Sequence, residues 1–294
     1  MSLKKTNRII APFLLILGLT VVCCSNKQQM QQLDRQAQEK EQKELKIRQK
    51  QEARKVAKLR ADSLAQACFP DTATYTKKYI YLTIDDGPSN ATPLINSVIL
   101  TEKVPVSIFA VGWKGDKKSL LLNNLKLYKD NPYIELYNHS YSHANDHYKL
   151  YYTNPKHVLA DFIKSDSILD LNTKVVRMPG RNMWRVGKRK RNDILSGISA
   201  ADTLAAHGYT LIGWDLEWSH RSDGVPVQSA AQIADEVKHL FESRHTFTKN
   251  NVVILLHDQM FTQPWEKDEL QKFLNILKAD SSYIFESAKK YPSR

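Results

Sequence analysis

The chain has 294 residues, of which 42% are hydrophobic, enough to bury one large core or two smaller ones. The formal net charge of +12 would suit a nucleic-acid partner, but residues 1–24 carry +3 of it and residues 25–68 carry +5. The remaining residues carry only +4 and contain no motif of a nucleic-acid-binding module, so we expect no nucleic-acid partner.

The first 24 residues are organised as a lipoprotein signal peptide. A basic start precedes an apolar run, residues 9–22, that is short for a membrane span and contains Pro12. The run ends in Val-Val-Cys-Cys-Ser, which resembles a bacterial lipobox with Cys24 as the lipidated residue. We therefore predict a cell-envelope protein held on a bacterial membrane by a lipid anchor, with Cys68 as its one remaining thiol. A cleaved secretory peptide and a buried apolar hairpin are the alternatives.

Residues 25–68 are predicted to form a charged helical spacer. They are rich in Gln, Lys, Glu, Arg and Ala and contain no Gly or Pro, so a complete helix would be roughly 60 Å long. Their apolar positions do not sustain a heptad, because Lys40 and Glu44 fall on the apolar seam. We prefer a solvated helix or partly disordered tether to a coiled-coil dimer. Phe69 then opens the predicted catalytic domain, residues 69–294.

In that domain, short apolar runs alternate with amphipathic stretches. The predicted strands are 79–84, 106–111, 133–137, 174–177, 210–214 and 252–256. The predicted helices lie near 92–102, 117–129, 155–169, 200–207, 228–243 and 266–279. Repeated strand–helix alternation indicates an α/β fold of parallel β/α units, and periodicity alone does not distinguish an open doubly wound sheet from a barrel.

Polar residues follow the predicted strands where each one ends. The first strand runs into Asp85 and Asp86, adjacent carboxylates that repel each other unless a positive group lies beside them. The third runs into His139 and His143, which would face the same way on one helical turn and could share a metal. Ser140 stands where a zincin has Glu, which argues against a metalloprotease. Two histidines and one aspartate would make an open three-ligand site for a divalent ion.

Three later strand ends carry weaker signals of the same kind. They hold Arg177, the Trp-Asp-Leu-Glu-Trp stretch at 214–218, and His257. A surface ion pair, core aromatics and a structural histidine would explain each one separately. Their recurrence at carboxyl ends of strands favours a shared site, because active sites of β/α folds assemble there.

With these motifs in this order, residues 77 to 292 resemble the polysaccharide deacetylase domain of carbohydrate esterase family 4. The matching segments are Thr-Ile-Asp85-Asp86-Gly-Pro, His139-Ser-Tyr-Ser-His143, Arg177-Met-Pro179-Gly180, the stretch at 214–218 and Leu255-Leu256-His257. The resemblance implies a distorted (β/α) barrel of about seven parallel strands, with the site at their carboxyl ends.

The resemblance also implies roles for single residues. Asp86, His139 and His143 would bind a divalent metal, usually zinc. Asp85 would be the catalytic base, held in place by Arg177, and a backbone N–H near 180–181 would stabilise the oxyanion. His257 would protonate the leaving group, paired with an acidic residue of the fourth motif for which we favour Asp215 over Glu217.

Two departures from the family pattern bear on these roles. The third motif of the family commonly has an aromatic residue between its Pro and its Gly, whereas here Gly180 directly follows Pro179. We therefore expect the loop that carries the oxyanion donor to be built differently from that of the family. The usual leading aspartate of the fourth motif aligns with Trp214, which leaves the partner of His257 open. Beside the motifs, Trp184 and Trp218 are candidates for stacking on sugar rings, although tryptophan is also ordinary core material.

The predicted activity is metal-dependent hydrolysis of N-acetyl groups on N-acetylglucosamine residues of a cell-envelope or chitin-like polysaccharide, releasing acetate. O-deacetylation of a polysaccharide at the same site is the first alternative. A catalytically inactive, glycan-binding envelope lipoprotein is the second, and the complete set of acidic and histidine residues argues against it.

Overall fold

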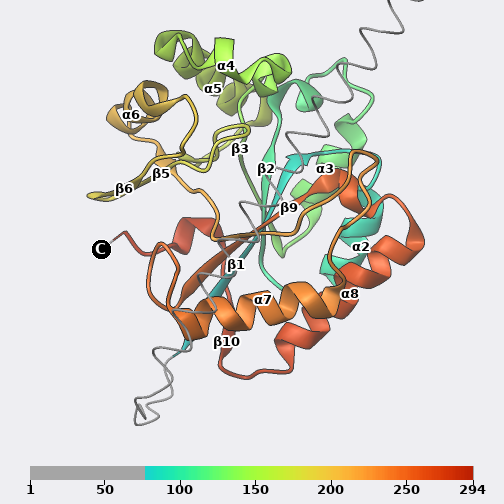
Figure 1. Cartoon of the computed structure of the whole chain (residues 1–294). Helices are drawn as coiled ribbons and strands as arrows, with labels where there is room; N and C mark the ends of the chain where they lie inside the picture. Colours follow the sequence, from blue (N-terminus) through green and yellow to red (C-terminus); the bar gives the residue numbers. More distant parts are fainter. Residues whose placement is uncertain (1–76, 294) are drawn as a thin grey trace, which may run out of the picture. The chain divides into compact units, whose positions relative to one another are not determined.

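The computed structural model describes residues 77–293 (Figure 1). The predicted signal peptide, its Cys24 and the predicted spacer lie outside the described residues. Within residues 77–293, no helix has both the length and the apolar character that crossing a membrane requires.

A single curved sheet forms the centre of the domain. Its strands are β1 (Lys78–Gly87), β2 (Val106–Ala110), β3 (Ile134–Asn138), β4 (Val175–Val176), β5 (Trp184–Val186), β6 (Arg189–Arg191), β7 (Thr210–Leu211), β8 (Leu216–Glu217), β9 (Asn251–His257) and β10 (Tyr283–Phe285). Seven of them, in the order β7-β4-β3-β2-β1-β9-β8, pair in parallel, and β10 adds to the start of β1. The predicted distorted barrel of about seven parallel strands is confirmed.

The barrel is distorted because a hairpin extends one edge of the sheet. Strands β5 and β6 pair antiparallel, and β5 also pairs antiparallel with β7. Among the described residues, no ladder joins this edge to β8 at the opposite edge. The sequence did not predict the hairpin, since its second strand is the basic run Arg189-Lys190-Arg191.

Helices cover the outer face of the sheet, except for one short helix that lies at the carboxyl ends of the strands (Figure 1). The helices are α2 (Thr92–Glu102), α3 (Leu122–Asp130), α4 (Tyr148–Tyr151), α5 (Pro155–Leu169), α6 (Ile198–Ala206), α7 (Ala230–Ser243) and α8 (Pro264–Lys278). The exception is α4, which follows the loop that carries His143. The predictions at 92–102 and 155–169 match α2 and α5 at both ends. Helix α3 begins later than predicted, because the side chains of Asp116 and Ser119 accept backbone N–H groups and form turns instead.

Alternation along β1 decides which side chains can reach the site. Ile80, Leu82 and Ile84 face the helices and belong to the main core, whereas Tyr81 faces the barrel interior with other aromatic residues. Asp85 is therefore on the interior side, at the end of a row of buried side chains.

The two tryptophans predicted to be candidates for a sugar-binding surface belong to the core. Trp184 and Trp218 both have an exposed fraction of 0%. Trp184 stacks on Phe247 at a centroid distance of 4.3 Å, and the Trp218 indole N–H donates to the carbonyl of Gln228. Neither ring is available to a glycan.

Candidate active site

The end of β1 presents both aspartates on one side because the strand is irregular there. The register against β2 shifts between Asp85 and Gly87, and Asp86 adopts a left-handed backbone with φ of 69°. In a regular strand, consecutive side chains would point to opposite faces. The bulge therefore brings both carboxylates toward the His139 ring, whose Nε2 lies 3.6 Å from Asp85 Oδ2 and 3.4 Å from Asp86 Oδ1.

A buried carboxylate beneath this turn fixes its position. Asp258, the residue after His257, accepts hydrogen bonds from Ser89 Oγ at 2.5 Å and from Tyr128 Oη at 2.8 Å. A Cβ atom on Gly87 would lie 2.7 Å from Asp258 Oδ2, so this position requires glycine. Burial raises the pKa of Asp258. The ends of β1 and β9 are thereby held together.

The two histidines converge through a loop, and the predicted single helical turn is wrong. Ser140 and His143 have φ of 64° and 52°, outside the helical region. Asn138 Oδ1 accepts from the Ser140 N–H at 2.8 Å, and Ser140 Oγ accepts from the His143 N–H at 3.0 Å. Asp161 of α5 accepts from Ser142. Side-chain hydrogen bonds thus supply the order that a helix would otherwise give.

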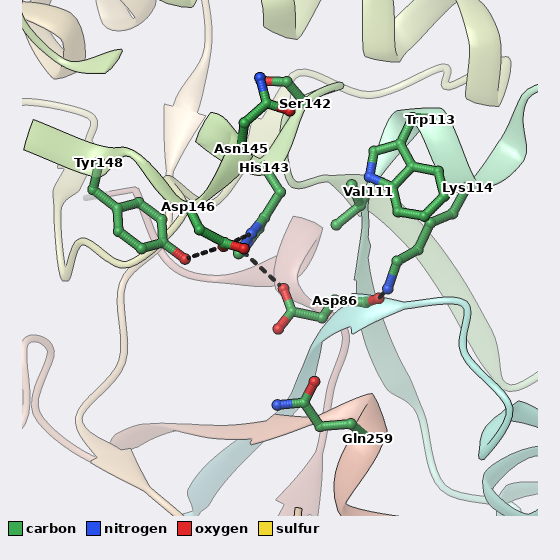
Figure 2. Close-up of a pocket in the computed structure, with 10 residues that line it drawn as sticks. All are labelled: Asp86, Val111, Trp113, Lys114, Ser142, His143, Asn145, Asp146, Tyr148 and Gln259. Carbon is green, nitrogen blue, oxygen red and sulfur yellow. Dashed lines mark hydrogen bonds and ion pairs between the residues drawn. The ribbon is translucent and has the colours of Figure 1, made fainter. Parts of the chain in front are cut away.

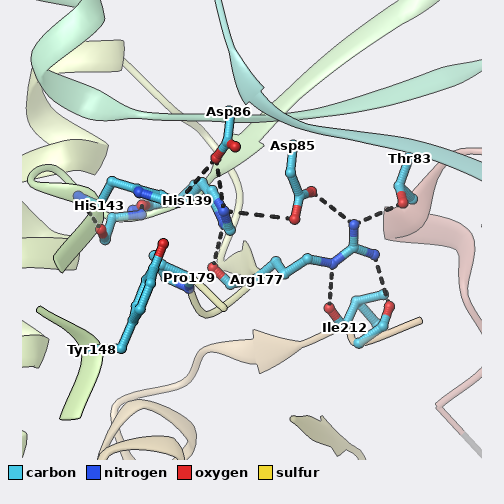
Figure 3. Close-up of polar contacts among 12 residues, drawn as sticks. Thr83, Asp85, Asp86, His139, His143, Tyr148, Arg177, Pro179 and Ile212 are labelled. Carbon is cyan, nitrogen blue, oxygen red and sulfur yellow. Dashed lines mark hydrogen bonds and ion pairs between the residues drawn. The ribbon is translucent and has the colours of Figure 1, made fainter. Parts of the chain in front are cut away.

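Asp86, His139 and His143 bring three possible ligand atoms within 4.8 Å of one another (Figure 3). Asp86 Oδ1 lies 3.0 Å from His143 Nε2 and 3.4 Å from His139 Nε2. That oxygen is buried and has no hydrogen-bond donor among the described residues. His139 Nδ1 donates to the carbonyl of Arg177 at 2.9 Å, so in the neutral ring Nε2 carries a lone pair.

These contacts fit a bound cation. Neutral imidazole nitrogens would otherwise point lone pairs at a carboxylate oxygen, which is unfavourable without positive charge between them. Burial alone would raise the pKa of Asp86, but hydrogen bonds and positive charge from protonated His139 and His143 lower it well below the ordinary value. When the imidazoles are neutral, a bound cation would supply that positive charge. One carboxylate and two imidazoles form a ligand set that suits zinc and other divalent ions and leaves positions open.

Arg177 holds Asp85 from inside the barrel. Its Nη1 donates to Asp85 Oδ1 at 2.8 Å and to Thr83 Oγ1 at 2.7 Å (Figure 3). Its Nε and Nη2 donate to the carbonyls of Ile212 and Gly213. The guanidinium is fully buried and supplies the positive charge that the adjacent carboxylates require.

His257 ends β9 directly beside Asp85 in the parallel ladder. Burial lowers its pKa, while the charges of Asp86, Asp85 and Glu217 act in the opposite direction. His257 Nδ1 is buried without a hydrogen-bond partner among the described residues.

The predicted pairing of Asp215 with His257 is corrected by this structure. Asp215 accepts backbone N–H groups from Phe247 at 2.8 Å and from Val253 at 3.0 Å, one on each oxygen. Burial raises its pKa to about 6. Val253 lies four residues before His257 on β9, so the Asp215 carboxylate binds backbone N–H groups inside the barrel, away from the His257 ring. Glu217 is the fourth-motif carboxylate whose charge acts on the pKa of His257.

A pocket of about 680 Å³ opens beside Asp86 and His143 (Figure 2). Its walls include residues that sequence reasoning missed: Trp113, Lys114, Asn145, Asp146, Tyr148 and Gln259. The ring of Trp113 is 45% exposed, and Lys114 Nζ donates to the carbonyl of Asp86. The feature of the sequence that could have indicated them is their position in the segments that follow β2, β3 and β9.

Comparison with known proteins agrees with this geometry. The family model described as polysaccharide deacetylase matches residues 72–210. A chitin disaccharide deacetylase of Vibrio alginolyticus is 24% identical over 330 residues, covering 80% of this chain and 76% of that protein.

Solved structures share the fold. A carbohydrate esterase of family 4 from Streptococcus mutans is 21% identical with a TM-score of 0.54, covering 71% of this chain and 86% of that one. The catalytic domain of a peptidoglycan N-acetylglucosamine deacetylase from Eubacterium rectale is 20% identical with a TM-score of 0.51, covering 77% and 96%. The chain is therefore similar to polysaccharide deacetylases over residues 72–210 and shares its fold with solved structures of carbohydrate esterase family 4.

Proposed function

We propose that the protein is a metal-dependent hydrolase that removes N-acetyl groups from N-acetylglucosamine residues of a cell-envelope or chitin-like polysaccharide and releases acetate. The observation that carries this proposal is the convergence of Asp86, His139 and His143 within 4.8 Å, next to the Asp85–Arg177 pair. The similarity to a chitin disaccharide deacetylase and to a peptidoglycan N-acetylglucosamine deacetylase supports the choice of substrate class.

In this proposal Asp86, His139 and His143 hold the divalent ion, with zinc as the preferred metal for two imidazoles and a carboxylate. When bound, such an ion polarises the acetyl carbonyl and acidifies the attacking water. Asp85 is the base that takes the proton from this water, and Arg177 holds its Oδ1 while Oδ2 lies 3.6 Å from His139 Nε2.

His257 is proposed to give a proton to the departing amine. It lies beside Asp85 in the ladder, so base and acid flank one reacting centre. Burial lowers the pKa of His257 below its ordinary value, and the charges of Asp86, Asp85 and Glu217 oppose that shift without cancelling it. The acid role therefore requires that His257 take up a proton during the reaction. The backbone N–H of Gly180 or Arg181, after the third motif, is the proposed donor to the oxyanion.

The direct test is release of acetate from N-acetylated chitooligosaccharides by the purified protein, before and after treatment with a chelator. We expect release that the chelator abolishes and that added zinc restores. The Asp86→Asn and His139→Ala variants should show neither activity nor restoration. Absence of metal-dependent release from every N-acetylated and O-acetylated glycan tried would refute the proposed function.

We also propose that the protein is lipidated on Cys24 and displayed from a bacterial membrane. The support is the lipobox-like segment and the charged spacer that follows it. Cells grown with a clickable palmitate analogue should label the wild-type protein and leave Cys24→Ala unlabelled. A wild-type protein that takes up no label would refute the anchor.

A further inference from the structure

The rings of His139 and His143 are held by different kinds of partner. His139 is buried, and its Nδ1 donates to a backbone carbonyl, that of Arg177. His143 lies at the open side of the site, where its ring is 21% exposed. Its Nδ1 lies 3.2 Å from Oδ1 of Asp146, three residues later (Figure 2). No family motif contains Asp146.

An unusual backbone brings Asp146 to this position. His143, Ala144, Asn145 and Asp146 all have positive φ, between 45° and 58°. Left-handed residues other than glycine cost free energy, and four in succession persist only where the surroundings enforce them. The chain therefore turns back on itself within one short segment, so that the Asp146 carboxylate meets the ring of His143.

Tyr148 holds the same carboxylate oxygen from the other side. Its hydroxyl donates to Asp146 Oδ1 at 3.2 Å, and its ring packs edge-on against the His143 ring at 5.7 Å. The ring also covers Gly180, where a Cβ atom would lie 3.2 Å from Tyr148 Cε1. Tyr148 therefore packs directly on the backbone of the third motif.

We infer that Asp146 and Tyr148 form a supporting pair for the metal site, which fixes the His143 ring with Nε2 directed at Asp86. The inference rests on the proposed function, in which His143 is a metal ligand. A carboxylate that accepts from Nδ1–H fixes the neutral tautomer, makes Nε2 a better ligand and prevents the ring from rotating. Tyr148 keeps the carboxylate in place, so both are positioning residues.

The competing explanation is an ordinary surface contact. The side chain of Asp146 is 82% exposed, and exposed ion pairs contribute little on their own. The chain contains a matched example of such a contact, since Asp235 Oδ2 lies 3.2 Å from His239 Nε2 on the exposed face of α7. Metal affinity separates the two explanations, because only the supporting pair would change it.

The test measures zinc affinity of the purified protein by competition with a chromophoric chelator, without any assay of activity. Asp146→Ala should weaken zinc binding by about 10-fold or more, in the range that loss of a residue supporting a metal ligand produces. Asp146→Asn keeps an acceptor oxygen and should weaken it less, by about threefold or more. Tyr148→Phe should also weaken it, by less than Asp146→Ala, and the control Asp235→Ala should bind zinc like the wild type.

Wild-type affinity in a folded Asp146→Ala protein, with unchanged circular dichroism and thermal unfolding, would overturn the inference. If that variant does not fold, wild-type affinity in Asp146→Asn would overturn it equally. A wild-type protein that binds no zinc, cobalt or manganese would overturn the proposed metal site together with the inference, so the two failures are distinguishable.

Discussion

Replacing Arg177 with methionine tests how the base is held. Methionine approximates the volume of the arginine stem but removes four hydrogen bonds, those to Asp85, Thr83, Ile212 and Gly213. Asp85 would then be a buried carboxylate, with its side chain only 4% exposed, lacking its main counter-charge. Removing one partner of a buried ion pair costs about 3–5 kcal/mol. The two orphaned carbonyls add to this cost unless water reaches them.

The assay is urea unfolding of four proteins: wild type, Arg177→Met, Asp85→Asn and the double variant. We expect Arg177→Met to lose about 3–5 kcal/mol of unfolding free energy. The double variant should regain part of it, since Asn at position 85 carries no charge, with a coupling energy of about 1.5–3 kcal/mol. A loss below about 1 kcal/mol, or the same loss with Asp and Asn at position 85, would refute the argument.

Replacing His257 with alanine should slow amide hydrolysis about 100-fold or more. It should slow acetate-ester hydrolysis far less, because an alcohol leaves with less help than an amine. Equal losses of rate on the two substrates in parallel assays would contradict a role of His257 as acid. Because burial lowers the pKa of folded His257 below its ordinary 6.5, the unfolded chain binds this proton at higher pH than the folded one. Stability should therefore be complete above pH 6.5 and fall as the pH drops below it, and urea titrations of His257→Asn should lack that part of the decline. Trp113→Ala should raise KM for chitooligosaccharides by about 2–10-fold with little change in kcat, as expected for loss of one aromatic contact. The control Trp265→Ala removes a tryptophan on α8 that is 50% exposed, and it should change neither constant. Equal effects of the two substitutions would exclude stacking of the substrate on Trp113.

The metal-site residues were predictable because their signal is local. Asp86, His139 and His143 lie where apolar runs end, and parallel strands bring their carboxyl ends to one edge. The local backbone was not predictable in the same way. A spacing of four residues suggested a helical turn, but His139 to His143 form a loop. The loop is fixed in position partly because Ser142 donates to Asp161, 19 residues later on α5, and that contact depends on how the helix packs.

The choice between Asp215 and Glu217 shows what the sequence lacks. The two residues are separated by one position, so in a strand both face the same side, and alternation cannot distinguish them. Register decides: Glu217 pairs with Leu255, near the end of β9, whereas Asp215 lies beside Val253, deeper in the barrel. The register between β8 and β9 depends on how both strands pack, so it cannot be predicted from the residue pattern of either strand alone.

The site has a buried half and an open half, and they differ in how many of their residues belong to the five motifs. Asp85, His139 and Arg177 are almost completely buried and come from the family motifs. The open half contains the motif residue His143, whose side chain is 21% exposed, together with Trp113, which is 45% exposed, and Asp146, whose side chain is 82% exposed. Trp113 and Asp146 belong to no motif. The proposed glycan substrate would approach the reacting centre across the open half, where the pocket beside Asp86 and His143 lies. The motif residues therefore account for the proposed chemistry, and we expect the choice of glycan to depend on pocket residues outside the motifs, such as Trp113, Asp146 and Gln259.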